Sequence, residues 1–358
     1  MFVLTAGGTG GHLFPAQAVA AELSDRGHAV SLITDARAKT LVADFPADAI
    51  HFLPAATPSV KNPVKFARAA AINATALVQA HGILRREKPL LVLGFGGYPT
   101  VPPLFAAKLR SLPRLIHEAN AVMGRANRVF VSGGHVATAF PDVKNVPSGA
   151  KSVTHVGMPV RPAVVEARSD YTAPTDEFRL LVFGGSQGAH VFSELLPPAI
   201  GALPDDQRAR LSLTAQIRAE DIEIARPKLE AFCGSVNIAP FFTDLPQQIA
   251  RAHLVIARAG ASTVTELSVI GRPSLLVPLP GALDQDQAGN ANALAALGGA
   301  KRLDQASLNP ESLGAELAAL MANPEQLGQM ATASRALARP DAASRLADLA
   351  ENVAKRIA

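Results

Sequence analysis

"AGGTGGHLFPA", residues 6–16, is the stretch that decides the fold of this 358-residue chain. It directly follows the apolar run "FVLT", and the residues behind it carry an apolar stripe at helical spacing that ends at Gly27: Leu13, Ala16, Val19, Ala20 and Leu23. A strand, a glycine-rich turn and an amphipathic helix in this order predict a βαβ unit. Glycine loses more backbone entropy on folding than any other residue, so we expect something to approach this main chain closely.

The same pattern recurs at "FGGSQGAH", residues 183–190, where Gly184-Gly185-Ser186 aligns with Gly7-Gly8-Thr9. A helix N-terminus presents unpaired N–H groups and a partial positive charge, which suit phosphate oxygens. Two such loops predict a phosphorylated or nucleotide ligand, and tight strand-to-helix packing without a ligand is the alternative. Neither loop is a Walker A or a G-x-G-x-x-G motif. Asp35 could still bind a ribose in the dinucleotide manner, which keeps a dehydrogenase as an alternative.

Size and composition favour two folded domains. The chain is longer than one core usually supports, and 48% of its residues are apolar and 18% charged. A net charge of +4 indicates an anionic partner, while two Tyr, no Trp and no Arg runs disfavour nucleic acid. The single Cys233 excludes an intramolecular disulfide and fits a reducing compartment. The first apolar run is too short for a signal peptide, and Pro89–Ala107 is too rich in Pro and Gly for a membrane span.

Short apolar runs alternate with helical patterns along the whole chain, which predicts parallel sheets buried on both faces. The expected strands are 2–6, 29–34, 90–95, 114–118, 179–184, 211–216, 236–241, 254–259 and 274–279. The expected core comprises Val3, Leu4, Val19, Leu23, Leu32, Val92, Leu115, Leu181, Val182, Val255, Ile256, Leu275 and Val277. "HVGMPVRP", residues 155–162, reads as a linker. After Pro340 a final helix carries Leu346, Leu349, Val353 and Ile357 on one face, and the sequence alone does not say where it docks.

Polar residues follow several of the expected strands. Ligands of doubly wound sheets bind at the carboxyl ends of strands, so these loops should converge on one crevice. His12, His117, Glu118 and Asn120 would form one wall, and Ser186, Glu266 and Gln287 the other. Glu266 suits a ribose diol, or alternatively a helix N-terminus. The amides of "DQDQAGNANA", residues 284–293, suit a sugar, and helix capping by Asp284 or Asp286 is the alternative. No His or carboxylate spacing indicates a metal site.

Seven segments occur here in the order of one family: "GGTGGH", "GGYPT", "IHEAN", "GMPVR", "GGSQGA", "RAGASTVTE" and "DQDQAGNA". On these the chain resembles, over almost its whole length, the MurG family of N-acetylglucosaminyltransferases. The resemblance implies an α/β GT-B fold, with two Rossmann-like parallel-sheet domains facing a cleft. It further implies an acceptor and membrane-binding domain at 1–160 plus 341–358, and a UDP-N-acetylglucosamine domain at 161–340.

The resemblance also implies a hexosyltransferase reaction. N-acetylglucosamine would pass with inversion from its UDP carrier to the 4-hydroxyl of the muramoyl sugar in undecaprenyl-diphosphate-linked lipid I. The product, lipid II, serves peptidoglycan synthesis, and hence cell shape and division. The enzyme would work without cofactor or metal, as a peripheral protein on the cytoplasmic face of the bacterial inner membrane. A non-hydrolysing UDP-sugar epimerase, which shares this architecture, is the main alternative. A non-catalytic carrier is a further one.

Carried over residue by residue, the family's site falls on both glycine loops. The implied donor site is Thr9, Gly10, Gly11, Asn120, Arg161, Ser186, Phe242, Ala261, Ser262, Thr263, Val264, Thr265, Glu266 and Gln287. Phe242 would meet the uracil through its backbone, Glu266 the ribose, and Ser186 with Arg161 the diphosphate. The implied acceptor site is Gly8, Thr9, Gly10, Gly11, His12 and Tyr98, where the loop would hold the lipid diphosphate. His12 is expected to be the general base, because an imidazole titrates near neutrality, and Glu118 is the second choice.

Three positions depart from the family's usual pattern, namely Ala119, Ser193 and Asp286, and they put individual sugar contacts in doubt. A membrane-facing surface is expected within residues 60–88. Its apolar members would be Val60, Val64, Phe66, Leu77, Ile83 and Leu84, and its basic members Lys61, Lys65, Arg68, Arg85, Arg86 and Lys88. An amphipathic helix packed on its own sheet is the alternative.

Overall fold

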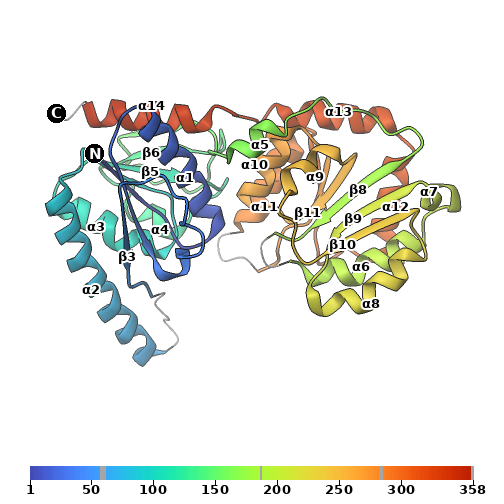
Figure 1. Cartoon of the computed structure of the whole chain (residues 1–358), viewed down its shortest axis with the longest axis horizontal. Helices are drawn as coiled ribbons and strands as arrows, with labels where there is room; N and C mark the ends of the chain where they lie inside the picture. The colour runs from blue at the N-terminus through green and yellow to red at the C-terminus, as the bar shows by residue number, and fades with distance from the viewer. Residues whose placement is uncertain (57–61, 186–187, 282–284, 356–358) are drawn as a thin grey trace. The chain divides into compact units, whose positions relative to one another are not determined.

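The computed structural model describes residues 1–56, 62–185, 188–281 and 285–355. The chain forms two compact units: Met1–Arg161 with Arg339–Ala358, and Pro162–Ala338. Each unit is built on one parallel sheet covered by helices, and Figure 1 labels these elements along the chain. Within the described residues no helix combines the length and the apolar character needed to cross a membrane.

The sheet of the first unit has the strand order β3-β2-β1-β4-β5-β6-β7. Its strands, all paired in parallel, are β1 (Phe2–Thr5), β2 (Val30–Asp35), β3 (Ala49–Leu53), β4 (Leu91–Gly94), β5 (Arg114–Glu118), β6 (His135–Thr138) and β7 (Ser152–His155). Phe2 of β1 pairs with Val30 on one side and with Leu91 on the other. The chain reverses its direction of travel through the sheet at this point, between β1 and β4, where doubly wound sheets bind ligands.

Alternate residues of these strands belong to two separate cores, one on each face of the sheet. Phe2 and Leu4 pack with α1 (Gly10–Asp25) and α14 (Ala342–Lys355). Val3, between them, packs on the opposite side with α2 (Pro63–Glu87) and α3 (Val101–Leu109). This is why the strands read as continuous apolar runs. Shorter helical segments of this unit are η1 (Ala36–Ala38), η2 (Tyr98–Thr100) and α4 (Arg125–Arg128).

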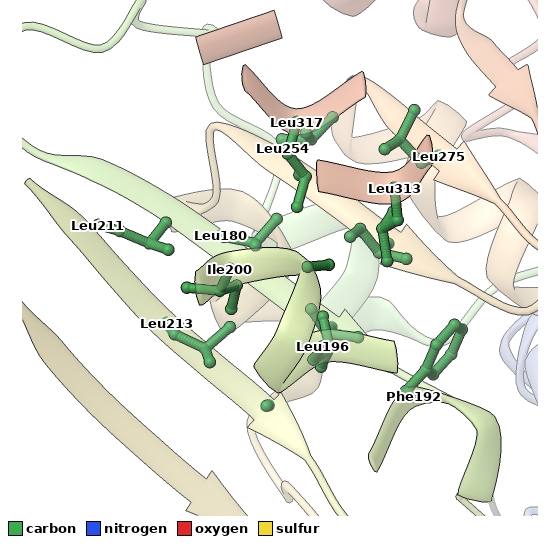
Figure 2. Packing of buried hydrophobic residues seen from close by; sticks show 14 of the residues in the cluster. Leu180, Phe192, Leu196, Ile200, Leu211, Leu213, Leu254, Leu275, Leu313 and Leu317 are labelled. Atoms are coloured by element: carbon green, nitrogen blue, oxygen red, sulfur yellow. The ribbon is translucent and has the colours of Figure 1, made fainter. Parts of the chain in front are cut away.

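The second unit repeats the topology, with the strand order β10-β9-β8-β11-β12-β13. These strands are β8 (Phe178–Phe183), β9 (Leu211–Gln216), β10 (Ser235–Ala239), β11 (Leu254–Ala257), β12 (Ser274–Leu276) and β13 (Ala300–Arg302). In Figure 2, Phe192, Leu196 and Ile200 from α6 and Leu313 and Leu317 from α12 meet the leucines of the sheet. The helices are α5 (Pro162–Glu166), α6 (His190–Gly201), α7 (Asp205–Ala209), α8 (Ala219–Glu230), α9 (Leu245–Arg251), α10 (Ala261–Ile270), α11 (Asp286–Ala296), α12 (Pro310–Met321) and α13 (Pro324–Arg335).

Most of the sequence-based expectations of the fold are confirmed. All nine expected strands are present, although several begin or end one to three residues away from the expected bounds. Every residue of the expected core is at most 1% exposed. The final helix packs within the first unit, with Leu346 and Val353 buried and in contact with α1 and β4, while Ile357 lies outside the described residues. Four strands were not expected from the sequence: β3, β6, β7 and β13.

Candidate functional site

The first glycine loop connects β1 to α1, and three of its four glycines are required by neighbouring protein atoms. A Cβ on Gly7 would lie 3.2 Å from the His12 ring, one on Gly8 2.1 Å from Asp35 Oδ1, and one on Gly10 2.8 Å from the Phe14 ring. Gly11 is different, because no described atom lies within 4 Å of its added Cβ. Close neighbouring atoms are thus a second reason for glycine at Gly7, Gly8 and Gly10, and the approach of a ligand to this loop stays a prediction.

His12 lies in the first turn of α1, half-buried beneath the loop that follows β4. Its Nδ1 is 3.0 Å from the carbonyl oxygen of Phe95, and because a carbonyl only accepts, Nδ1 carries the proton and Nε2 keeps its lone pair. The imidazole lies against Gly96 and Gly97, both with left-handed φ (92° and 84°). Burial lowers the pKa of His12 below 6.5, and the charge of Arg37 lowers it further, against the Phe95 hydrogen bond. The ring is thus neutral near pH 7, and its Nε2 can accept a proton.

Glu118, at the end of β5, is enclosed by hydrogen-bond donors. Its Oε1 accepts from the backbone N–H and the side-chain amide of Asn120, at 2.9 and 3.3 Å. Its Oε2 accepts from Gly124 N–H at 3.0 Å and from Asn127 Nδ2 at 2.7 Å. Burial raises the pKa of Glu118, while these hydrogen bonds act in the opposite direction. With both oxygens occupied, this carboxylate shapes the loop that carries Asn120 and is a poorer general base than His12.

His117 does not line a wall, contrary to expectation. Its side chain is 0% exposed, and Nε2 donates to the carbonyl of Gly157 at 3.0 Å, which ties β5 to the segment that leaves the first unit. Burial lowers the pKa of His117 to about 4. Tyr98, by contrast, is 45% exposed in η2.

Asp35 is not free to bind a ribose. Its Oδ2 accepts from Arg37 Nε and Nη2 at 2.8 and 2.6 Å, and its Oδ1 accepts from Arg37 N–H at 3.1 Å and faces Gly8. The side chain is 4% exposed. The dinucleotide interpretation is therefore wrong.

Two further residues of the expected site belong to the first unit. Thr9 is the exposed N-cap of α1, and its hydroxyl makes no capping hydrogen bond to the helix. Arg161, the last residue before the second unit, holds its guanidinium carbon 4.7 Å from the centre of the Phe14 ring. This cation–π contact places a positive charge next to the first turn of α1.

In the second glycine loop, as in the first, some glycines lie close to other protein atoms and one does not. A Cβ on Gly184 would lie 2.3 Å from Ala189 N, and one on Gly188 would lie 3.1 Å from Arg218 Cγ. Gly185 has a left-handed φ of 85° and no described atom within 4 Å of an added Cβ. Ser186, an expected donor contact, lies outside the described residues. In each loop, one glycine has no described atom within 4 Å of an added Cβ.

Ser193, one of the departures from the family pattern, has a partner in the structure. Its Oγ donates to Asp221 Oδ2 at 2.9 Å, and the same oxygen is 2.8 Å from Nδ1 of His190, the first residue of α6. This hydrogen bond and the Asp221 charge raise the pKa of His190. The pair thus favours a cationic imidazole beside the second glycine loop.

The segment "RAGASTVTE" forms the turn from β11 into α10. Ala261, Ser262 and Thr263 begin the helix and are partly exposed, as is Thr265. Val264 is 0% exposed and its N–H already donates to Gly260, so it has no group left for a ligand. Glu266 is 9% exposed in the second turn.

Gln287 lies in the first turn of α11, where its Oε1 accepts from Leu279 N–H at 3.0 Å. Asp286 is the first residue of α11 and accepts from the N–H of Gln287 at 2.9 Å, but the N-cap position is Gln285, so Asp286 is a first-turn acid and not the cap. Asp284 lies outside the described residues. Phe242 is half-buried in the loop after β10.

Two polar residues at strand ends had no role in the sequence-based site. Arg258, 9% exposed after β11, donates from Nη1 to the carbonyls of Val277 and Pro278 at 3.1 and 3.3 Å, and so joins the loops that follow β11 and β12. Gln216 ends β9. The sequence signal that could have identified both residues is a polar side chain at the carboxyl end of a buried strand. Among the described residues no group of three His, Cys, Asp or Glu side chains is placed to hold a metal ion.

Comparison with known proteins identifies similar chains over the full length. The N-terminal domain of glycosyltransferase family 28 matches residues 2–136, and its C-terminal domain matches residues 179–350. The chain is 50% identical to the UDP-N-acetylglucosamine–N-acetylmuramyl-(pentapeptide) pyrophosphoryl-undecaprenol N-acetylglucosamine transferase of Rhizobium johnstonii, over 99% of this chain and 96% of that one. It is 51% identical to the Mesorhizobium japonicum protein of the same name, with the same shares covered.

Solved structures agree with these relatives. The crystal structure of Acinetobacter baumannii MurG superposes with a TM-score of 0.81 at 32% identity, covering 98% of this chain and 99% of that chain. A putative UDP-N-acetylglucosamine 2-epimerase from Listeria monocytogenes reaches a TM-score of 0.69 at 16% identity, covering 96% of this chain and 94% of that one. At that identity the likeness shows the fold alone.

Proposed function

The chain belongs to the MurG family of N-acetylglucosaminyltransferases, within glycosyltransferase family 28, and from this premise we propose how its residues carry out the reaction. It has the GT-B fold and transfers N-acetylglucosamine from UDP-N-acetylglucosamine to lipid I, which gives lipid II for peptidoglycan synthesis. Identity of 50% over nearly the full chain supports this reaction, whereas an epimerase is only a distant neighbour in fold.

We assign the two glycine loops to two diphosphates. The loop of the first unit would hold the lipid diphosphate of the acceptor, and the loop of the second unit the diphosphate of the donor. The observation that carries this assignment is that each loop has one glycine, Gly11 or Gly185, with no described atom within 4 Å of an added Cβ. Both loops lead into helices, whose first N–H groups favour phosphate oxygens.

The chemical step forms one bond and breaks another. The 4-hydroxyl oxygen of the muramoyl sugar attacks the anomeric carbon of N-acetylglucosamine, whose bond to the UDP oxygen breaks, and attack from the opposite face inverts the configuration. Nε2 of His12 takes the hydroxyl proton. Negative charge grows on the departing UDP, and Arg161 together with helix N-terminal amides would stabilise it. This arrangement needs no metal ion, so transfer should persist in EDTA.

For the donor, the remaining contacts follow the family. Phe242 would present its backbone to the uracil, Glu266 would accept hydrogen bonds from the ribose hydroxyls, and the Gln287 amide would face the sugar. Asn120, held by Glu118, is a further expected sugar contact. Glu266 is almost buried, so its carboxylate is positioned before any ligand arrives.

The membrane-facing surface is smaller than expected from the sequence. Ile83 and Leu84 are only 8% and 0% exposed and belong to the core beneath α2, so their assignment to this surface is wrong. Val64 and Phe66, at the start of α2, are 78% and 46% exposed. Val60 and Lys61 lie outside the described residues. We therefore place contact with the cytoplasmic face of the inner membrane at the first turns of α2.

Lys65 and Arg68, both exposed in these turns, supply charge for an anionic leaflet. Replacing both by Glu should weaken sedimentation with vesicles containing anionic lipid, because attraction becomes repulsion. The matched control reverses Arg226 and Lys228 on α8 of the second unit. Unchanged vesicle binding by the Lys65/Arg68 double variant would place the membrane contact elsewhere.

The reaction itself is tested by UDP release from UDP-N-acetylglucosamine, with and without a short-chain lipid I analogue, in EDTA. We expect release that depends on the acceptor. The His12→Gln variant should lose about 100-fold or more in kcat, the usual contribution of a general base. Near-normal turnover in that variant would remove His12 from the mechanism, and formation of a UDP-sugar isomer without acceptor would indicate an epimerase.

A further inference from the structure

The side-chain amide of Gln216 joins two loops at the carboxyl end of the second sheet. Gln216 is the last residue of β9 and is 5% exposed. Its Oε1 accepts from Gly184 N–H at 3.0 Å, and its Nε2 donates to the carbonyl of Gly185 at 3.0 Å and to that of Pro240 at 3.2 Å. Both amide hydrogens and the amide oxygen are therefore used.

The topology explains why this position can reach both loops. Strand β9 lies between β8 and β10, and all three run parallel, so their carboxyl ends lie at the same edge of the sheet. The loop after β8 contains Gly184 and Gly185, and the loop after β10 leads through Pro240 to Phe242. A side chain at the end of the middle strand is the natural link between its two neighbours.

The two loops that Gln216 joins are proposed to bind different parts of the same ligand. Gly185 has no described atom within 4 Å of an added Cβ, and the direction of its carbonyl is held by the hydrogen bond from Gln216 Nε2. Pro240 lies two residues before Phe242, the proposed uracil contact. A nucleoside diphosphate must span both loops, whereas a nucleoside alone meets only one.

We propose that Gln216 is a positioning residue that holds the diphosphate loop and the nucleobase loop at the spacing of a nucleoside diphosphate. This rests on the proposed function, in which these two loops bind UDP. Gln216 does not touch the donor. It sets the distance between the two groups that do, and so it contributes to affinity for UDP more than to affinity for either part.

Two substitutions alter the three hydrogen bonds of the Gln216 amide in different ways. Gln216→Met keeps the length and removes all three hydrogen bonds. Gln216→Glu keeps an acceptor for Gly184 N–H and turns the second oxygen toward two carbonyl oxygens. Unsatisfied buried groups of this kind weaken a dependent interaction by about tenfold to 100-fold.

The experiment measures inhibition constants of UDP and of uridine against UDP-N-acetylglucosamine, with KM for donor and acceptor. For Gln216→Met we expect a donor KM and a UDP inhibition constant raised about 10-fold or more, uridine changed less than threefold, and an unchanged acceptor KM. Gln216→Glu should show the same pattern, and it replaces Gln216→Met in the experiment if that variant does not fold. The matched control is Gln207→Met. Gln207 donates to Ala318 O at 3.1 Å from α7, at the amino ends of the strands, and its loss should leave donor KM unchanged.

The outcomes distinguish failure of this inference from failure of the proposed function on which it rests. UDP inhibition within twofold of the wild type, or equal weakening of UDP and uridine, overturns the role of Gln216. If Glu266→Ala also leaves UDP inhibition unchanged, the proposed donor site itself is wrong. Weakening of UDP in both Glu266→Ala and Gln216→Met, with uridine spared only in the latter, supports both.

Discussion

Gly11 offers a substitution that should stabilise the protein and impair its reaction. It is the second residue of α1, its φ is not left-handed, and no described atom lies within 4 Å of an added Cβ. Alanine is therefore accepted without a clash. Gly within a helix is less favourable than Ala by about 0.5–1 kcal/mol, and a first-turn position should give about the lower value.

The size of the effect can be stated for both readouts. At about 2–4 °C per kcal/mol for a domain of this size, Gly11→Ala should raise the melting temperature by about 1–2 °C. The added methyl group occupies the space proposed for the lipid diphosphate, so the acceptor KM should rise about tenfold or more, equivalent to about 1.4 kcal/mol.

Gly8→Ala is the matched comparison on the same loop. Its Cβ would lie 2.1 Å from Asp35 Oδ1 and 3.0 Å from the backbone N of Ala38, so the buried Asp35 carboxylate, which is paired with Arg37, must move. Overpacking of this kind costs about 1–3 kcal/mol. Thermal unfolding followed by circular dichroism gives stability, and acceptor-dependent UDP release gives KM. A Gly11→Ala enzyme with native kinetics, or one less stable than the wild type, would refute the reasoning.

Three further predictions concern protons, charge and metal. Because burial and the Arg37 charge lower the pKa of His12, the acid limb of kcat/KM should lie below pH 6.5, and Arg37→Ala should move it upward; an unmoved limb would separate Arg37 from the base. Burial lowers the pKa of His117 from 6.5 unfolded to about 4 folded, so the unfolded chain binds more protons between these values. The contribution of this pKa shift to the free energy of unfolding, about 3 kcal/mol, is present above pH 6.5 and lost as pH falls toward 4. The His117→Gln variant should therefore show a free energy of unfolding, measured with urea, that depends less on pH across that window. Transfer should continue in EDTA, and loss of UDP release that added Mg²⁺ restores would contradict the proposed role of Arg161.

Most strands buried on both faces could be predicted from the sequence, and most strands at the edges of the sheets could not. β1, β4, β8 and β11 are wholly or almost wholly buried, so they read as apolar runs. β3 and β7 have partly exposed residues at almost every position, and β13 has three residues, so neither alternation nor apolar run marks them. β6, "HVAT", is buried at three positions but offers only Val and Ala as an apolar signal. Edge position accounts for the omission of β3, β7 and β13, whereas β6 was missed because its apolar signal is weak.

The amino-acid sequence by itself determined the doubly wound architecture, its duplication, the two glycine loops and the family. These depend on spacings within about ten residues and on motif order, which need no knowledge of contacts. Only the tertiary structure decided which glycine in each loop is open, that Asp35 and Glu118 are already occupied by Arg37 and by the loop of Asn120, and that Gln216 joins two strand ends. The physical reason is that these outcomes depend on backbone conformation and side-chain orientation, which decide which atoms, near or distant along the chain, fill the same few ångströms, and residue spacing carries no record of that.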